Sequence, residues 1–127
     1  MPTTKVNAQE LHFEHTLWTK ELSFATDEIK FFEKKLSDIV SVFSDREVLA
    51  NLEHFQNQFI RQKEVVDELN HKIKIHEQDL SNRLKTNSEL NDNMTENHTK
   101  MRDDMMMFRK LFAELKKEFF QFLGKVL

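Results

Sequence analysis

The stretch from residue 11 to residue 43, LHFEHTLWTKELSFATDEIKFFEKKLSDIVSVF, contains a series of residues at alternating intervals of four and three. Nearly all members of this series are hydrophobic. This heptad spacing is typical of a helix that buries one stripe of side chains against other helices. The chain has a single Pro, Pro2, and a single Gly, Gly124, so its interior lacks the two residues that most readily interrupt helices. The stripe consists of Leu11, His15, Trp18, Leu22, Ala25, Ile29, Phe32, Leu36, Ile39 and Phe43.

The same spacing recurs twice further along the chain. The second stripe consists of Val48, Leu52, Phe55, Phe59, Gln62, Val66, Leu69, Ile73, His76 and Leu80. The third consists of Met94, His98, Met101, Met105, Phe108, Phe112, Leu115, Phe119, Phe122 and Val126. We therefore predict an all-α protein with helices over about residues 8–43, 45–86 and 88–124.

Polar residues between the stripes indicate where the helices end. Ser44 and Glu47 have the spacing of a capping box, which predicts the start of the second helix, and Gly124 is the expected C-terminal cap of the third. The second turn could fall at residues 86–88 or at residues 91–93. We favour the earlier position because it gives three helices of similar length, each about 55 Å long.

Short connections between long amphipathic helices favour antiparallel neighbours. We therefore expect residues 1–127 to form a single domain, an antiparallel up-down-up three-helix bundle with coiled-coil-like heptad packing. In such a bundle, residue i of the first helix lies beside about residue 89 minus i of the second. The alternative architecture joins the second and third helices into one rod that dimerises.

Composition excludes several classes of function. The 127 residues carry a net charge of −3, which is too balanced to indicate a nucleic-acid surface, and there is no cysteine for disulfide or thiolate chemistry. No apolar stretch is long enough to span a membrane, and residues 1–10 do not resemble a secretion signal, so we expect a cytoplasmic protein. There is no phosphate-binding loop, nucleophile elbow or metalloprotease motif, so we expect no enzymatic activity.

Histidines are the main polar exceptions within the three stripes. The expected turns bring His15, His76 and His98 to one layer of the bundle, near the end that holds the amino terminus. Three inward imidazoles could bind Zn²⁺ or another divalent ion, with water, Glu14 or Asp79 as the fourth ligand. Alternatively, these histidines are partly solvated polar residues bonded to Asn97 or water, or they form a layer that loosens when protonated.

A second hydrophobic series on the first helix faces away from the stripe. It consists of Phe13, Leu17, Phe24 and Phe31. Such a patch commonly marks an association surface, and a second copy of the chain is the simplest partner. Alternatively, the helices are rotated so that a neighbouring helix covers the series.

Residues 108–127 could also form a membrane-surface helix, but their apolar positions continue the third stripe and favour a core helix. The sequence therefore predicts a non-enzymatic, self-associating interaction module. The alternative function is a metal-binding or pH-sensing bundle that uses the three histidines.

Overall fold

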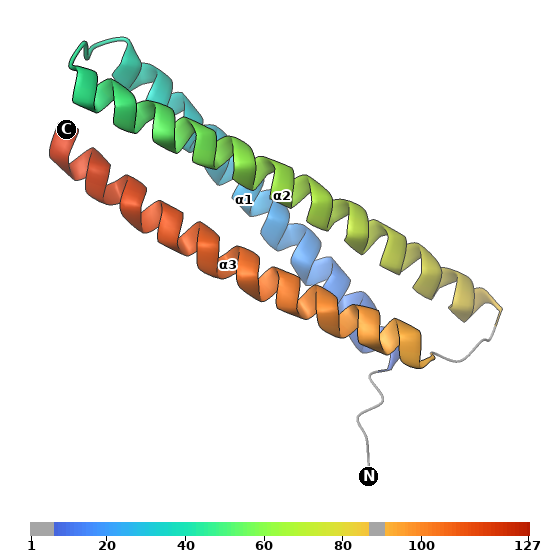
Figure 1. The fold of residues 1–127 in the computed structure, drawn as a ribbon. Helices are drawn as coiled ribbons and strands as arrows, with labels where there is room; N and C mark the ends of the chain where they lie inside the picture. The colour runs from blue at the N-terminus through green and yellow to red at the C-terminus, as the bar shows by residue number, and fades with distance from the viewer. Residues whose placement is uncertain (1–6, 87–90) are drawn as a thin grey trace.

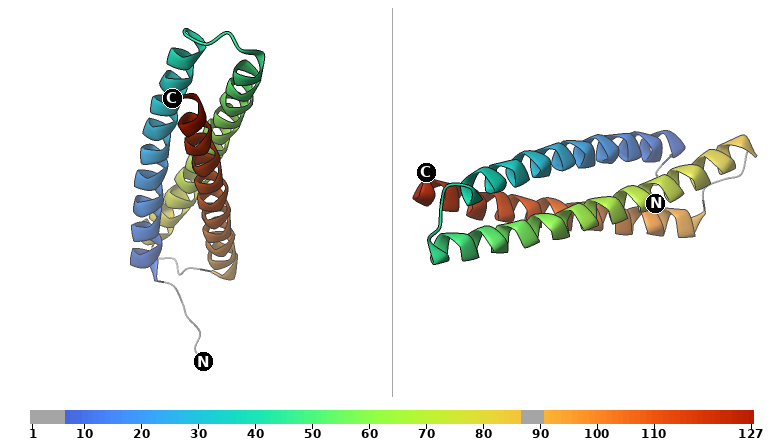
Figure 2. Two further views of the ribbon diagram at one scale, coloured as in Figure 1. Left: turned by 90° about the vertical axis from the view of Figure 1, so that its left-hand side faces the viewer. Right: turned by 90° about the horizontal axis from the view of Figure 1, so that it is seen from above.

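The computed structural model describes residues 7–86 and 91–127, which form three long helices (Figure 1). Helix α1 spans Ala8–Val40, α2 spans Arg46–Lys85 and α3 spans Asp92–Val126. Helix α2 runs opposite to α1 and α3, so the arrangement is up-down-up (Figures 1 and 2). The three-helix bundle predicted from the heptad spacing is therefore confirmed.

Burial follows the three stripes closely. Leu22, Ile29, Phe59 and Phe119 are fully buried. The Phe32 ring contacts the rings of Phe59 and Phe119, which forms an aromatic cluster shared by all three helices. Three members at the ends, Phe43, Val48 and Val126, and the more exposed His76 are only partly buried. The four-three pattern therefore predicts the core because it marks the side of each helix that faces the other two.

The ends of the helices differ from the prediction in two places at the first turn. Helix α1 ends at Val40, and Phe43 packs against the core from outside the helix. Helix α2 is capped by Asp45 rather than by Ser44, because the Asp45 carboxylate accepts bonds from the backbone N–H groups of Glu47 and Val48. The capping box expected from Ser44 and Glu47 is thus wrong by one residue.

The second connection lies between Lys85, the last residue of α2, and Asp92, the first of α3. The Asn91 side chain caps α3 by accepting a bond from the N–H of Met94 at 2.9 Å. Helix α3 therefore begins after the predicted boundary at residue 88, which lies outside the described residues. The rod that would join α2 to α3 is excluded, because Asn91 has extended backbone angles at the start of α3.

Gly124 does not end α3, which continues to Val126. A Cβ atom added at Gly124 would meet nothing within 4 Å, so the position is an ordinary exposed helical site. We expect Gly124→Ala to raise the unfolding free energy by about 0.5–1 kcal/mol, because alanine loses less backbone entropy in a helix. Urea denaturation measures the change, and a destabilised variant would show that this glycine is needed for its backbone freedom.

Candidate functional site

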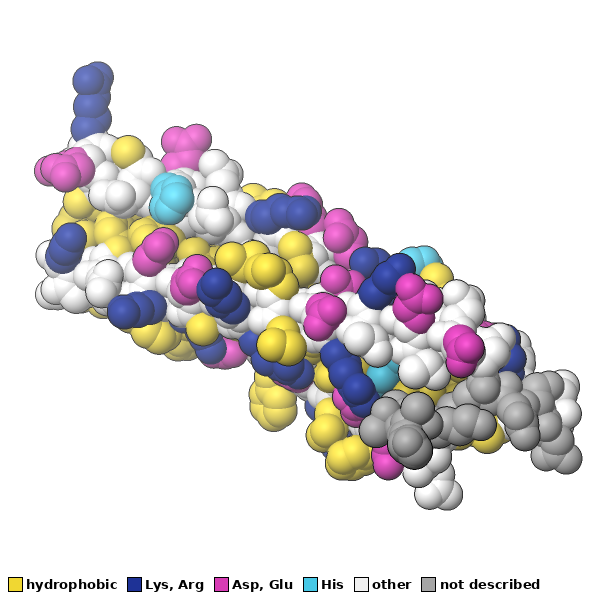
Figure 3. Space-filling view, turned by 60° about the horizontal axis from the view of Figure 1, so that its bottom comes forward, with side chains coloured by type: hydrophobic (Ala, Val, Ile, Leu, Met, Phe, Trp, Pro, Cys, Tyr) yellow, Lys and Arg dark blue, Asp and Glu magenta, His cyan; other side chains and the backbone are white. Residues whose placement is uncertain are grey.

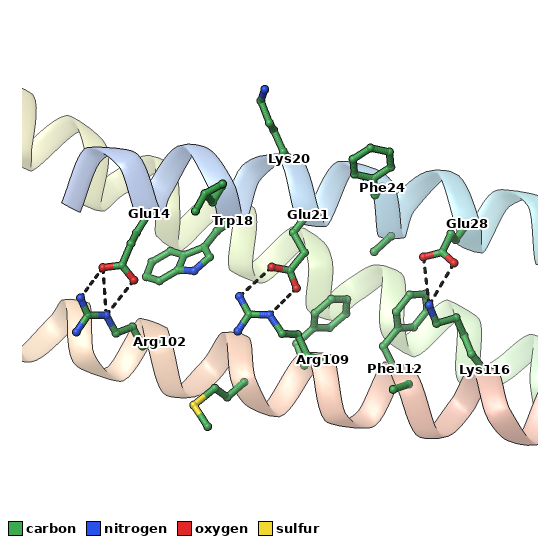
Figure 4. Close-up of a pocket in the computed structure, with 15 residues that line it drawn as sticks. Glu14, Trp18, Lys20, Glu21, Phe24, Glu28, Arg102, Arg109, Phe112 and Lys116 are labelled. Atoms are coloured by element: carbon green, nitrogen blue, oxygen red, sulfur yellow. Dashed lines mark hydrogen bonds and ion pairs between the residues drawn. The ribbon is translucent and has the colours of Figure 1, made fainter. Parts of the chain in front are cut away.

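Three ion pairs join α1 to α3 along one side of the bundle. Glu14, Glu21 and Glu28 of α1 point toward α3, where they meet Arg102, Arg109 and Lys116 (Figure 4). Both sets repeat every seven residues, and each pair is separated by 88 residues in sequence. Because the offset is constant, α1 and α3 are parallel and in register. We call these three pairs the ion-pair ladder.

Bidentate geometry strengthens two pairs of the ladder. Arg109 donates to the two carboxylate oxygens of Glu21 at 2.6 and 2.8 Å, and these bonds raise the pKa of the Arg109 guanidinium. Arg102 donates to Glu14 and lowers the pKa of that carboxyl, although burial opposes this effect. The ladder connects α1 to α3, which are the two helices that approach each other least closely in the bundle.

Exposed hydrophobic side chains flank the ladder on both helices. On α1 they are Leu17, Phe24 and Phe31, which are 47%, 72% and 66% exposed. On α3 the corresponding positions are Met106, Ala113 and Phe120. We call these six residues the α1/α3 face; Figure 3 shows hydrophobic side chains reaching the surface between charged ones.

An open groove of about 920 Å³ runs along this face (Figure 4). Leu17 and Phe24 line it from α1, and Met106 and Ala113 line it from α3. The Phe24 ring stands on α1 and points away from α3 (Figure 4). The groove has an apolar wall on each helix and charged residues between the walls, which suits a further amphipathic helix.

The partner-binding residues predicted from the sequence, Phe13, Leu17, Phe24 and Phe31, are all exposed on α1. Leu17, Phe24 and Phe31 recur every seven residues along α1. Leu17 and Phe24 line the groove, whereas Phe13 and Phe31 lie outside it. Sequence reasoning missed the contribution of α3. The sequence signal for it was a repeat of seven residues that runs from Met106 through Ala113 to Phe120.

The three predicted histidines meet in one layer of the bundle. Trp18 lies between this layer and most of the hydrophobic core. The ring centre of His15 lies 5.2 Å from that of His98 and 6.2 Å from that of His76. Trp18 stacks on His98 at 4.9 Å. His15 and His98 are buried and His76 is partly buried. We call these three side chains the histidine layer.

Carboxylates from the neighbouring helix hold two of these rings. Nδ1 of His15 lies 2.8 Å from Oε1 of Glu77, whose other oxygen lies 2.7 Å from Nδ1 of His12. Nε2 of His98 lies 3.0 Å from Oε1 of Glu14, rather than bonding to Asn97 as the alternative interpretation expects. Glu77 was missed in the sequence, although the pairing rule for the first two helices places residue 77 beside His12.

Burial lowers the pKa of two of the histidines in the layer. It lowers the pKa of His98, and the hydrogen bond and charge of Glu14 partly oppose this effect. Burial also lowers the pKa of His76, and repulsion from His15 acts in the same direction. Burial therefore favours the neutral form of both rings.

The histidine layer lines a partly open cavity of about 20 Å³, which is large enough for one water molecule or ion. Asp79 and Asn97 also line this cavity. As they stand, no three His, Cys, Asp or Glu side chains among residues 7–86 and 91–127 are placed to hold a metal ion together. A metal would therefore require one of the rings to move.

The described helices include none that is both long and apolar enough to cross a bilayer. Comparison of the chain with protein-family models, curated proteins and solved structures finds no match.

Proposed function

We propose that the protein is a non-enzymatic helical bundle that acts as an interaction module and pairs with a second copy of itself through the α1/α3 face. The observation that carries the proposal is the row of exposed Leu17, Phe24 and Phe31 beside the groove. Side chains of this size rarely occupy outer heptad positions unless another surface covers them.

The spacing of the row suits a two-fold pairing. If two α1 helices pair antiparallel with Phe24 at the centre, Leu17 of each copy lies level with Phe31 of the other. A two-fold axis matches a surface with itself, so a row that is symmetric about its middle residue satisfies this condition. The row spans about 21 Å, or 14 residues at 1.5 Å each.

Charge supports the same arrangement. Lys20 and Asp27 are exposed on one flank of Phe24, and the antiparallel pairing brings Lys20 of each copy within about one residue of the level of Asp27 of the other. On the other flank, Glu21 and Glu28 of the two copies approach each other. Their charges are already balanced by the ladder, because Arg109 and Lys116 bind them within each chain. The pairing therefore adds opposite charges on one flank without placing unpaired like charges on the other.

Light scattering of the purified chain tests the proposal. Because the face is small, we expect a weak dimer with a dissociation constant on the order of micromolar, and a mass that rises with concentration from 15.3 kDa toward twice that value. Phe24→Glu should weaken the dimer at least about 100-fold, since it places a charge at the centre of the interface in both copies.

The matched control is Ile60→Glu, which introduces the same charge at an exposed hydrophobic residue of α2 outside the face. This variant should dimerise like the wild type. A monomer at high micromolar concentration would contradict the proposal, as would a dimer that Phe24→Glu leaves intact. A monomer that instead binds an unrelated amphipathic helix through Phe24 would assign the face to another partner.

A further inference from the structure

The histidine layer interrupts an otherwise apolar interior. On one side lies the main core, which includes Trp18, Ile73 and Met101, and on the other side lies a small cluster of Leu11, Leu80 and Met94. Between them, each helix contributes one imidazole to the same cavity, and Asp79 adds a carboxylate to its lining. Three imidazoles and one carboxylate or water are a typical donor set for Zn²⁺.

His15 is already arranged as a metal ligand would be. Its side chain is 4% exposed, and Nδ1 is held by Glu77 at 2.8 Å. The other ring nitrogen, Nε2, is buried and has no hydrogen-bond partner among the described residues. Metal-binding histidines commonly direct one nitrogen to a carboxylate and the other to the ion, and a buried polar atom without a partner costs stability.

The separation of the ring centres fits a shared ion for one of the three histidine pairs and nearly fits for a second. Two imidazoles on one tetrahedral Zn²⁺, with Zn–N distances of about 2.1 Å, have ring centres roughly 5 Å apart. His15 and His98 are 5.2 Å apart, whereas His15 and His76 are 6.2 Å apart. His76 is the most exposed of the three, so turning its side chain inward is the smallest change that closes the site.

We propose that His15, His76 and His98 bind one Zn²⁺, or a divalent ion of similar ligand preference, inside each chain. Asp79 or water completes the coordination, and Glu77 and Glu14 orient the rings of His15 and His98. His98 then ligates through Nδ1, because its Nε2 faces Glu14. The inference does not depend on self-association, because all four side-chain ligands, the three histidines and Asp79, belong to the same chain.

Titration of the metal-free chain with Zn²⁺ tests this inference, with Co²⁺ as a spectroscopic probe. We expect one ion per chain, an intense visible absorption from tetrahedral Co²⁺, and a rise in melting temperature of roughly 5–10 °C at a Zn²⁺ concentration 100 times the dissociation constant. His76→Gln should weaken binding at least about 10-fold, and His98→Gln should do the same while keeping a donor for Glu14.

His71→Gln is the matched control, because His71 is an exposed histidine of α2 outside the layer. It should bind Zn²⁺ like the wild type, and circular dichroism shows whether each variant remains helical. The inference is overturned if the chain shows no Zn²⁺-dependent melting shift, or if His76→Gln and His98→Gln bind as tightly as the wild type. It is also overturned if the ion binds at one per two chains with an increase in mass, which would place it between copies.

Discussion

Replacing Phe119 with alanine should lower the free energy of unfolding by about 3–5 kcal/mol, the largest loss expected from a single truncation in this bundle. The Phe119 side chain is fully buried, and its ring centre lies 5.1 Å from that of Phe59 and 5.3 Å from that of Phe32. Phe119→Ala therefore removes one ring from a cluster shared by all three helices and leaves a cavity.

Urea denaturation measures this loss as a lower midpoint with an unchanged slope. Phe24→Ala is the control, because it makes the same truncation at a side chain that is 72% exposed. At protein concentrations low enough to keep the chain monomeric, the control should change the unfolding free energy by less than about 0.5 kcal/mol. Similar losses for both variants would show that Phe119 is not at the centre of the core.

Acidification below pH 6.5 should destabilise the metal-free protein through the histidine layer. The folded state keeps the pKa values of His76 and His98 below their ordinary value of 6.5, mainly by burial. The unfolded chain therefore binds protons at these positions at a higher pH than the folded chain does. The stabilisation is complete above pH 6.5 and is lost as the pH falls through the lower folded pKa values.

The groups around the two rings set the size of this effect. His98 faces Glu14, His15 and Arg102. Glu14 raises the pKa of His98, whereas His15 and Arg102 lower it. His76 faces His15 and Lys72, which favour a lower pKa, and Asp79, which opposes it. Each proton bound only on unfolding costs up to about 1.4 kcal/mol per pH unit.

Urea denaturation in the presence of a chelator, between about pH 7.5 and 5.5, measures this pH dependence. A variant that carries both His76→Gln and His98→Gln should show a flatter profile than the wild type. A second loss of unfolding free energy is expected below pH 4.5. Arg102 lowers the pKa of Glu14, and their ion pair is lost when that carboxyl is protonated. Equal profiles for the two proteins between pH 7.5 and 5.5 would contradict the role of the histidines.

The sequence predicts the core well because burial in a helical bundle depends on a spacing that can be read directly. His15 and His98 show this clearly, since both are polar and both are buried at the positions that the heptad assigns to them. The meeting of His15, His76 and His98 was predictable for the same reason. Antiparallel helices with short turns fix which residues share a level.

Local chemistry at the helix ends was less predictable. Ser44 and Asp45 can both cap a helix, and the backbone geometry of the first turn selects Asp45. Gly124 resembles a helix terminator, yet α3 continues past it. The first turn thus offers two residues of similar capping preference, and a glycine near the end of a helix does not by itself end it.

Side-chain partners at the helix flanks could be predicted only in part. Glu77 lies at the level that the pairing rule gives for His12, but its second bond, to His15, depends on the rotation of α2. The contribution of Met106 and Phe120 to the α1/α3 face depends on how α1 and α3 are rotated relative to each other. Heptad spacing marks the buried side of each helix, but it does not show which flanks remain uncovered.

The central proposal is that two copies pair antiparallel through α1, and a distance between spin labels tests it most directly. The chain lacks cysteine, so Lys34→Cys provides a single labelling site on α1. Because residue 34 lies ten residues from Phe24, the antiparallel dimer should hold the two labels at least about 30 Å apart, at 1.5 Å per residue. A separation near 10 Å, the usual distance between the axes of packed helices, would indicate parallel pairing. Either that short distance or the absence of any coupling between labels at high micromolar concentration would contradict the account.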